Sequence, residues 1–117
     1  ADDRKALWEA LNDGRIDIVA TDHAPHTLEE KRQSYSKAPS GGPLVQHAIL
    51  AMFESYHQGK ISIEKIVEKM CHNPAKIFKI ENRGFIKAGY FADLVIFNLI
   101  YQMQNFIFVV YAIVSIM

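Results

Sequence analysis

Charge is distributed very unevenly along this chain of 117 residues. All thirteen basic and all thirteen acidic side chains lie between Asp2 and Asp93, and the segment from Leu94 to Met117 has none. The chain has the size of one ordinary domain, and its charged part can surround an apolar core with polar surface. The uncharged end therefore needs an explanation of its own.

The overall composition excludes several classes of protein. A formal net charge of zero gives no basis for a nucleic-acid-binding surface, and a hydrophobic content of 50% argues against disorder. Cys71 is the single cysteine, which excludes an internal disulfide and a zinc site built from cysteines. The first residues are polar and no apolar segment follows them, so we expect no signal peptide and a cytoplasmic location.

The hydrophobic pattern predicts an α/β arrangement. Apolar residues at helical spacing predict helices over residues 3–12, 44–58 and 62–72, and Asn73-Pro74 predicts a short helical turn. Ser62 is expected to cap the third helix, with Ile61 and Ile66 packed on each other. Mostly apolar, β-branched residues predict strands over residues 16–21, 85–87 and 92–97. Residues 22–43, rich in proline and glycine, are predicted to form a long loop of a kind that is usually functional or disordered.

The polar residues directly after the first predicted strand form the candidate site. Asp22 and His26 stand where a strand opens into a loop, and ligands of α/β proteins bind at the carboxyl ends of strands. Asp22 can act as a general base or bind a metal, and His26 can bind an anion, ligate a metal or move a proton. The residues alone leave an alternative open, in which Asp22 only caps the loop and a histidine only hydrogen-bonds to the backbone.

Several segments resemble the dihydroorotases, a family of the amidohydrolase superfamily. The resemblance covers about residues 1–97 and depends on residues 19–26 (Val-Ala-Thr-Asp-His-Ala-Pro-His), 29–31, 37–42, 73–78 and 84–97. The string Asp-His-Ala-Pro-His favours the dihydroorotases over the hydantoinases and allantoinases, which stay as alternatives.

The resemblance implies an α/β fold in which this chain is the C-terminal fragment of a (β/α)8 barrel. Residues 1–80 would supply the last barrel strand and its helices, residues 81–98 strands of a small accessory β-domain, and residues 99–117 an aberrant apolar tail. A complete barrel needs about 250 residues, and the family's His-x-His pair and its other histidine ligands are absent here. We therefore expect a chain that cannot complete the zinc site and is inactive alone.

The family's reaction is the zinc-dependent, reversible hydrolysis of L-dihydroorotate to N-carbamoyl-L-aspartate in pyrimidine biosynthesis. By resemblance, Asp22 contacts the metal and passes a proton from the attacking water to the leaving nitrogen, and His26 holds the substrate carboxylate. Ser40 and Gly41 match a backbone pair that hydrogen-bonds to the ring, where a glycine lets the backbone approach the ligand. His23 is expected to form a hydrogen bond rather than to ligate the metal.

The resemblance also implies partners for the parent protein. It leaves open a homodimer or an association with aspartate transcarbamoylase. A non-catalytic scaffold beside that enzyme is an alternative function, but a scaffold has no physical need for the carboxylate of Asp22 or the imidazole of His26.

The uncharged segment after Asn98 has two interpretations. A frameshift explains a run rich in Ile, Phe, Tyr, Asn and Met that departs from the polar ending of the family, and we favour it. The alternative is a membrane-seeking segment, but its most apolar part, residues 106–117, is shorter than the roughly 20 residues that a spanning helix needs. In both cases the segment is prone to aggregate, because it is apolar, uncharged and free of proline.

Overall fold

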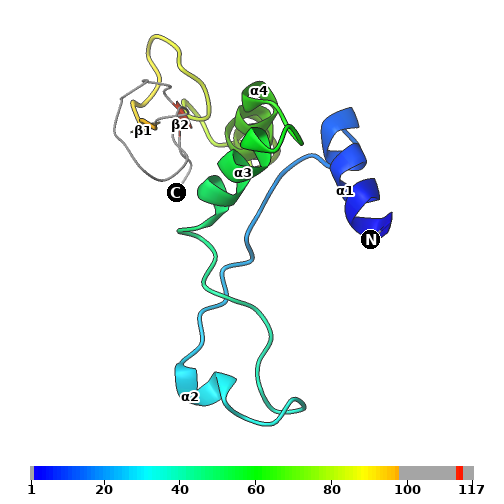
Figure 1. The fold of residues 1–117 in the computed structure, drawn as a ribbon. Helices are drawn as coiled ribbons and strands as arrows, with labels where there is room; N and C mark the ends of the chain where they lie inside the picture. The colour runs from blue at the N-terminus through cyan, green and yellow to red at the C-terminus, as the bar shows by residue number, and fades with distance from the viewer. Residues whose placement is uncertain (1, 98–112, 115–117) are drawn as a thin grey trace.

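Helices dominate the fold, with one short pair of strands beside them (Figure 1). A computed structural model describes residues 2–97 and 113–114. In chain order the elements are α1 (Asp2–Asp13), α2 (Leu28–Lys31), α3 (Ala48–His57), α4 (Ile63–Val67), the π-helix η1 (Glu68–His72), α5 (Asn73–Ile77), β1 (Leu94–Val95) and β2 (Ile113–Val114).

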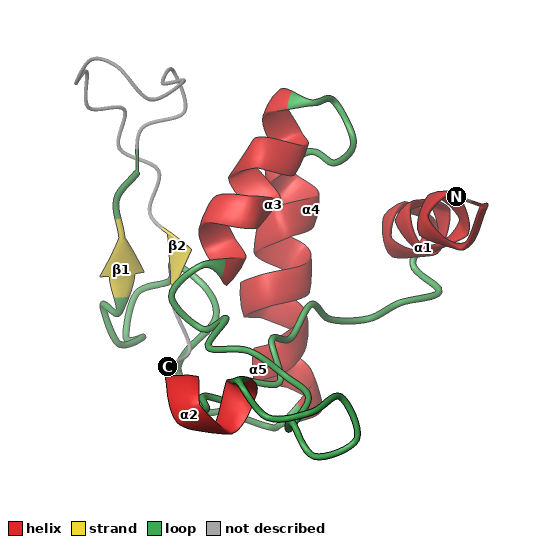
Figure 2. Cartoon of the chain, turned by 60° about the horizontal axis from the view of Figure 1, so that its bottom comes forward, coloured by secondary structure: helices red, strands yellow, loops and turns green. Residues whose placement is uncertain are grey.

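The core lies where α1, α3 and α4 meet. Leu11, Met52 and Ile66 come from these three helices and are buried in one cluster with Ile61, which precedes α4. Figure 2 shows α3 and α4 side by side, as does Figure 1. The Ser62 side chain accepts a hydrogen bond from Lys65 N at 3.2 Å, which confirms Ser62 as the N-cap of α4. Ile61 and Ile66, which were expected to pack on each other across that cap, are both buried in the core.

The helical backbone continues from α4 through η1 into α5. The φ and ψ angles are right-handed helical at both junctions, that is at Val67, Glu68, His72 and Asn73. The helix predicted to end near residue 72 therefore extends to Ile77, and α4, η1 and α5 together form one helical run over residues 63–77. Pro74 has no N–H, and its ring would clash with a carbonyl in a regular α-helical turn. A wider π-helical turn directly before Pro74 accommodates this ring within the helix.

Asn73 does not cap a separate helical turn, contrary to the prediction. Its side-chain Nδ2 donates a hydrogen bond to Asp17 O at 2.8 Å and so attaches the segment after α1 to α5. Val19 N of the same segment donates to Lys69 O at 3.2 Å. Segment 17–21 is therefore held against the helical run through its own backbone.

The prediction of a strand over residues 16–21 is wrong for the part of the chain that the structure describes. These residues have no regular secondary structure. A strand needs a neighbouring strand for its hydrogen bonds, and the sheet of the described residues contains β1 and β2 alone. Segment 17–21 lies against a helix instead. The described residues therefore contain no barrel strand, and the barrel implied by the resemblance stays a prediction.

The predicted helix over residues 44–58 begins later than expected, at Ala48. Leu44 O accepts hydrogen bonds from both His47 N and Ala48 N, which closes a turn before the helix. The helix ends at His57, and Gly59 follows with a positive φ of 69°, as its expected stop.

The C-terminal strands are shorter than predicted. Residues 85–87 form no strand, because the loop after α5 packs on the helical run, where the rings of His72 and Phe85 stack with centroids 4.2 Å apart. Within the loop, Arg83 forms an ion pair with Asp93. The strand over residues 92–97 is reduced to β1, which pairs antiparallel with β2, Leu94 opposite Val114.

The two interpretations of the segment after Asn98 fall mostly outside the described residues, because only residues 113 and 114 of that segment are described. Over residues 2–97 and 113–114, no helix has both the length and the apolar character needed to cross a bilayer.

Candidate active site

The long loop closes so that its two arms meet. Ala24 N donates a hydrogen bond to Gly42 O at 3.1 Å, which joins the arm that follows Asp22 to the arm that contains Gly41. The two arms cross between α2 and α3 (Figure 1). Gly41 has a φ of +92°, and a Cβ at this position would lie 2.6 Å from the Ala24 Cβ. Glycine is therefore required here for contact between the arms, a reason that differs from the expected close approach to a ligand.

Asp22 lies at the corner where segment 17–21 enters the loop. Its φ is +45°, in the left-handed region that few residues other than glycine adopt. Aspartate tolerates this conformation better than most residues. The Asp22 side chain is exposed, so its carboxylate is accessible for binding or proton transfer.

The two histidines of the motif have different surroundings. His23 Nδ1 accepts a hydrogen bond from Val45 N at 3.2 Å, so this nitrogen carries a lone pair and the ring joins the loop to the turn before α3. His26 Nδ1 lies 3.8 Å from Glu30 Oε2, and its side chain is 24% exposed. His23 thus accepts a hydrogen bond from the backbone, whereas His26 remains partly accessible beside a carboxylate.

Helix α2 begins just after His26, with Thr27 between them as its N-cap in a capping box. Thr27 Oγ1 accepts from Glu30 N at 3.2 Å, and Glu30 Oε2 accepts from Thr27 N at 2.7 Å and from its hydroxyl at 3.0 Å. These bonds from Thr27 to the ionised carboxylate lower the pKa of Glu30. The reciprocal bonds stabilise the short helix and keep a negative charge close to His26.

Lys31, the last residue of α2, joins the two arms of the loop but was not among the predicted site residues. Lys31 Nζ donates to Pro39 O at 2.7 Å and to Gly41 O at 2.5 Å. These carbonyls are eight and ten residues further along the chain. No side-chain pattern could have identified the contacts, because backbone carbonyls occur at every position.

The structure brings the four predicted site residues into one closed loop. Asp22 and His26 lie on one arm, and Ser40 and Gly41 lie on the other, with Ser40 exposed. Their roles in catalysis and binding stay predictions.

The described residues do not form a metal site by themselves. Over residues 2–97, no group of three or more His, Cys, Asp and Glu side chains is placed to hold an ion together. Since zinc sites in proteins use at least three protein ligands, the donor set of this chain does not fit a zinc ion without further ligands. Asp22 can contribute one carboxylate to a set completed by other residues.

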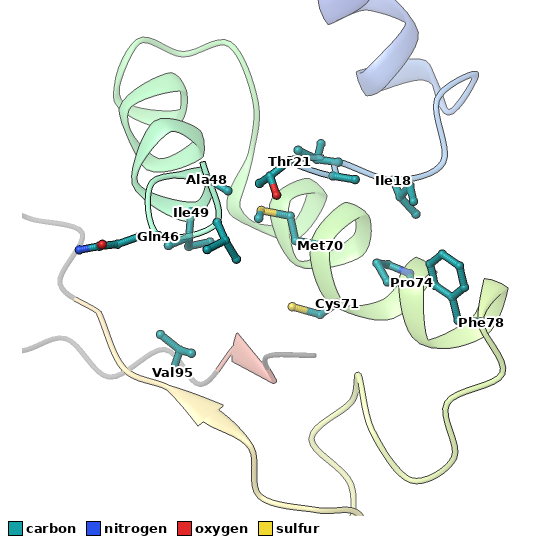
Figure 3. Close-up of a pocket in the computed structure, with 13 residues that line it drawn as sticks. Ile18, Thr21, Gln46, Ala48, Ile49, Met70, Cys71, Pro74, Phe78 and Val95 are labelled. Atoms are coloured by element: carbon teal, nitrogen blue, oxygen red, sulfur yellow. The ribbon is translucent and has the colours of Figure 1, made fainter. Parts of the chain in front are cut away.

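An apolar groove of about 520 Å³ lies between segment 18–21, α3 and the helical run (Figure 3). Thr21, Cys71 and Val95 are among the residues that line it, whereas Asp22, His26, Ser40 and Gly41 are not. Burial raises the pKa of the Cys71 thiol to about 11, so the thiol stays protonated near neutral pH. The groove therefore offers apolar surface and no reactive group of the candidate site.

Comparison with known proteins gives matches over most of the chain. The model of the amidohydrolase family matches residues 1–115. A dihydroorotase of Halobacterium salinarum is 48% identical over 93 residues, which are 80% of this chain and 22% of that protein. A dihydroorotase of Clostridioides difficile is 46% identical over 97 residues, 82% of this chain and 23% of the relative.

The chain spans less than a quarter of the length of these two relatives. The similarity to dihydroorotases confirms the resemblance seen in the motif segments, and the family match includes nearly the whole chain. This chain, with its closed loop of Asp22, His26, Ser40 and Gly41, belongs to the amidohydrolase family.

Proposed function

We propose that the chain is the C-terminal portion of a dihydroorotase and contributes one loop to its active site. The full enzyme would interconvert the cyclic amide L-dihydroorotate and N-carbamoyl-L-aspartate in pyrimidine biosynthesis. The observation that supports this most is the hydrogen bond from Ala24 N to Gly42 O, which holds the Asp22 and Gly41 segments together. Two separate parts of the motif thus meet in the structure.

Asp22 is the proton-transfer group of the proposed reaction. Its carboxylate takes a proton from the attacking water as general base and gives it to the ring nitrogen when the carbon–nitrogen bond breaks. Its exposed position at a backbone corner supports this role, because a buried and fully bonded carboxylate could not reach a substrate.

His26, Ser40 and Gly41 bind the substrate in this proposal. His26, partly accessible and 3.8 Å from Glu30, binds the substrate carboxylate through its imidazole. Ser40 and Gly41 form hydrogen bonds to the substrate ring through their backbone groups. The zinc implied by the resemblance needs ligands beyond the described residues, so this chain acts only together with the remaining part of such an enzyme. A cytoplasmic location and a homodimeric or transcarbamoylase-bound parent belong to the same proposal.

A complementation assay with Asp22→Asn tests this function. The chain is co-expressed with the part of the Clostridioides difficile dihydroorotase that precedes the matched region, and turnover of L-dihydroorotate is measured. Wild-type chain is expected to restore activity, and Asp22→Asn should lower kcat by about 10² to 10⁴, the usual contribution of a general acid–base group. His26→Ala should mainly raise KM.

Asp17→Asn is the matched control, because Asp17 is an exposed aspartate whose described contact is made by its backbone carbonyl and not its carboxylate. A near-wild-type rate for Asp22→Asn would refute the role of Asp22. No turnover with the wild-type chain, combined with stable binding to aspartate transcarbamoylase in the absence of zinc, would favour the scaffold alternative.

A further inference from the structure

We propose that Lys31 is the positioning residue of this site, because it holds the Ser40–Gly41 arm in the orientation that meets the substrate. The proposal rests on the proposed function for its substrate, and it adds a residue to which the resemblance gives no role. Lys31 itself does not contact the substrate. It acts through the two carbonyl groups that its ammonium binds.

The ammonium group forms two strong contacts with one short stretch of backbone. Lys31 Nζ lies 2.7 Å from Pro39 O and 2.5 Å from Gly41 O, on either side of Ser40. Hydrogen bonds from a charged donor are shorter and stronger than those between neutral groups. Two such bonds restrict rotation of the backbone on both sides of Ser40.

The bond to Pro39 O also sets the direction of the Ser40 amide. The peptide bonds of the described chain are all trans, so the Pro39 carbonyl and the Ser40 N–H lie in one plane and point in opposite directions. When Lys31 holds the carbonyl on its own side, the Ser40 N–H is turned to the other side of the loop. A backbone donor with a defined direction is what binding of a substrate ring requires.

The Lys31 side chain starts from a fixed point. Its helix, α2, is closed by the reciprocal bonds between Thr27 and Glu30, and Glu30 Oε2 lies 3.8 Å from His26 Nδ1. His26 thus directly precedes the N-cap residue of this short helix, and Lys31 is its last residue. Through Lys31, the proposed carboxylate-binding residue is connected to the proposed ring-binding backbone.

The contact between the arms also depends on Lys31. Ala24 N donates a hydrogen bond to Gly42 O, and Gly42 directly follows Gly41, whose carbonyl Lys31 binds. Gly41 lies so close to Ala24 that a Cβ built on Gly41 would be 2.6 Å from the Ala24 Cβ. Without the ammonium, this backbone bond and the bond from Val45 N to His23 Nδ1 are left to hold the long loop closed in solvent. We therefore expect the loop to open more often when Lys31 loses its charge.

Three variants test the proposal. Lys31→Met removes the ammonium and keeps an unbranched side chain, and Lys31→Arg keeps a cationic donor. Lys37→Met is the matched control, because Lys37 is an exposed lysine of the same loop. Each variant is studied as the full chain by hydrogen exchange of the Ala24 amide, and in the complementation assay with N-carbamoyl-L-aspartate as substrate.

In the full chain, Lys31→Met should speed exchange at the Ala24 amide by about tenfold, because the loop opens more often. In the complemented enzyme, it should raise KM by about tenfold, while kcat changes less than about threefold, because binding geometry and not proton transfer is lost. Lys31→Arg should recover most of the KM, and Lys37→Met should behave as wild type in both measurements.

Two results would overturn the proposal, and a third would remove its substrate role. The first is unchanged Ala24 exchange in Lys31→Met, which shows that the lysine does not hold the arms. The second is an unchanged KM in an active complemented enzyme, which shows that the contact has no role in binding. The third is an absence of turnover with the wild-type chain, in which case the substrate role is lost together with the proposed function, and the exchange data alone decide whether Lys31 closes the loop.

Discussion

Replacement of Gly84 by alanine tests how closely the loop after α5 approaches the helical run. Gly84 is buried with a φ of +79°, and a Cβ built there would lie 2.4 Å from the Ala75 Cβ and 2.8 Å from Cys71 O. Neither neighbour is the flexible end of a side chain, so relief requires a shift of the loop or of the helix. Gly89 offers a matched control, because it has a similar φ of +85° and nothing within 4 Å of its Cβ position.

The expected loss of stability has two parts. The left-handed conformation costs a residue with a Cβ about 1–2 kcal/mol, and this part applies to both glycines. Overpacking adds about 1–3 kcal/mol at Gly84 alone. We therefore expect Gly84→Ala to lower the free energy of unfolding by about 2–5 kcal/mol, a large share of the roughly 5–15 kcal/mol typical of a domain, and Gly89→Ala by about 1–2 kcal/mol.

Urea unfolding of the full chain, followed by circular dichroism, measures the two losses. The stacking of His72 on Phe85, with ring centroids 4.2 Å apart, provides a local signal, because ring-current shifts in the NMR spectrum disappear when the loop moves away. Gly84→Ala should weaken these shifts, and Gly89→Ala should preserve them. Equal losses of stability in both variants, with the His72 shifts unchanged, would refute the close approach.

Three further predictions concern the helical run. Burial raises the pKa of Cys71 to about 11, so iodoacetamide should label the native chain much more slowly than the urea-unfolded chain, and equal rates would contradict this. Hydrogen bonds from Lys65 and then Lys69 lower the pKa of Glu68 to about 2 from its ordinary value of 4.5. The stability that this carboxylate contributes is therefore present above about pH 4.5 and lost as the pH falls towards 2. Glu68→Gln should remove that part of the acid dependence of unfolding, and an unchanged dependence would show that the ion pairs contribute nothing. Ser62→Ala should lower the free energy of unfolding by about 1 kcal/mol through loss of the cap on α4, as measured by urea unfolding; no loss would show that the cap is replaceable.

The parts of the fold that follow from local interactions could be predicted. The helix expected over residues 3–12 is observed as α1, because an amphipathic pattern and a following Asp-Gly turn act within a few residues of one another. The cap at Ser62 is equally local, since its partner is Lys65 N. The stop after α3 depends on Gly59, whose positive φ was indicated by its residue type alone.

The predicted strand over residues 16–21 failed for a different reason. Its β-branched residues favour an extended backbone, but a strand exists only with a hydrogen-bonding neighbour. In the described structure Val19 N bonds to Lys69 O instead, a partner that the pattern of residues 16–21 does not contain. The length of the helical run was underestimated in a similar way, because a proline usually marks a helix start and the π-helical turn before Pro74 is rare.

For the candidate site, the residue types could be predicted and the contacts could not. Asp22, His26, Ser40 and Gly41 were identified from their motif segments, and the long loop that holds them was expected from its prolines and glycines. The bonds from Lys31 to backbone carbonyls were missed, since any residue supplies a carbonyl. Their roles in catalysis and binding stay predictions for the assays above.

The amino-acid sequence by itself determined the family of this chain, its main helices and the identity of the candidate site residues. These depend on residue type and on spacing within a few positions, which act along the chain. Tertiary structure decided that Ala24 meets Gly42, that Lys31 Nζ binds the carbonyls of Pro39 and Gly41, and that Gly84 lies against Cys71. Each of these contacts joins positions that are not neighbours along the chain, and each involves a backbone atom or a glycine that leaves room for its partner. Close packing in three dimensions selects such partners.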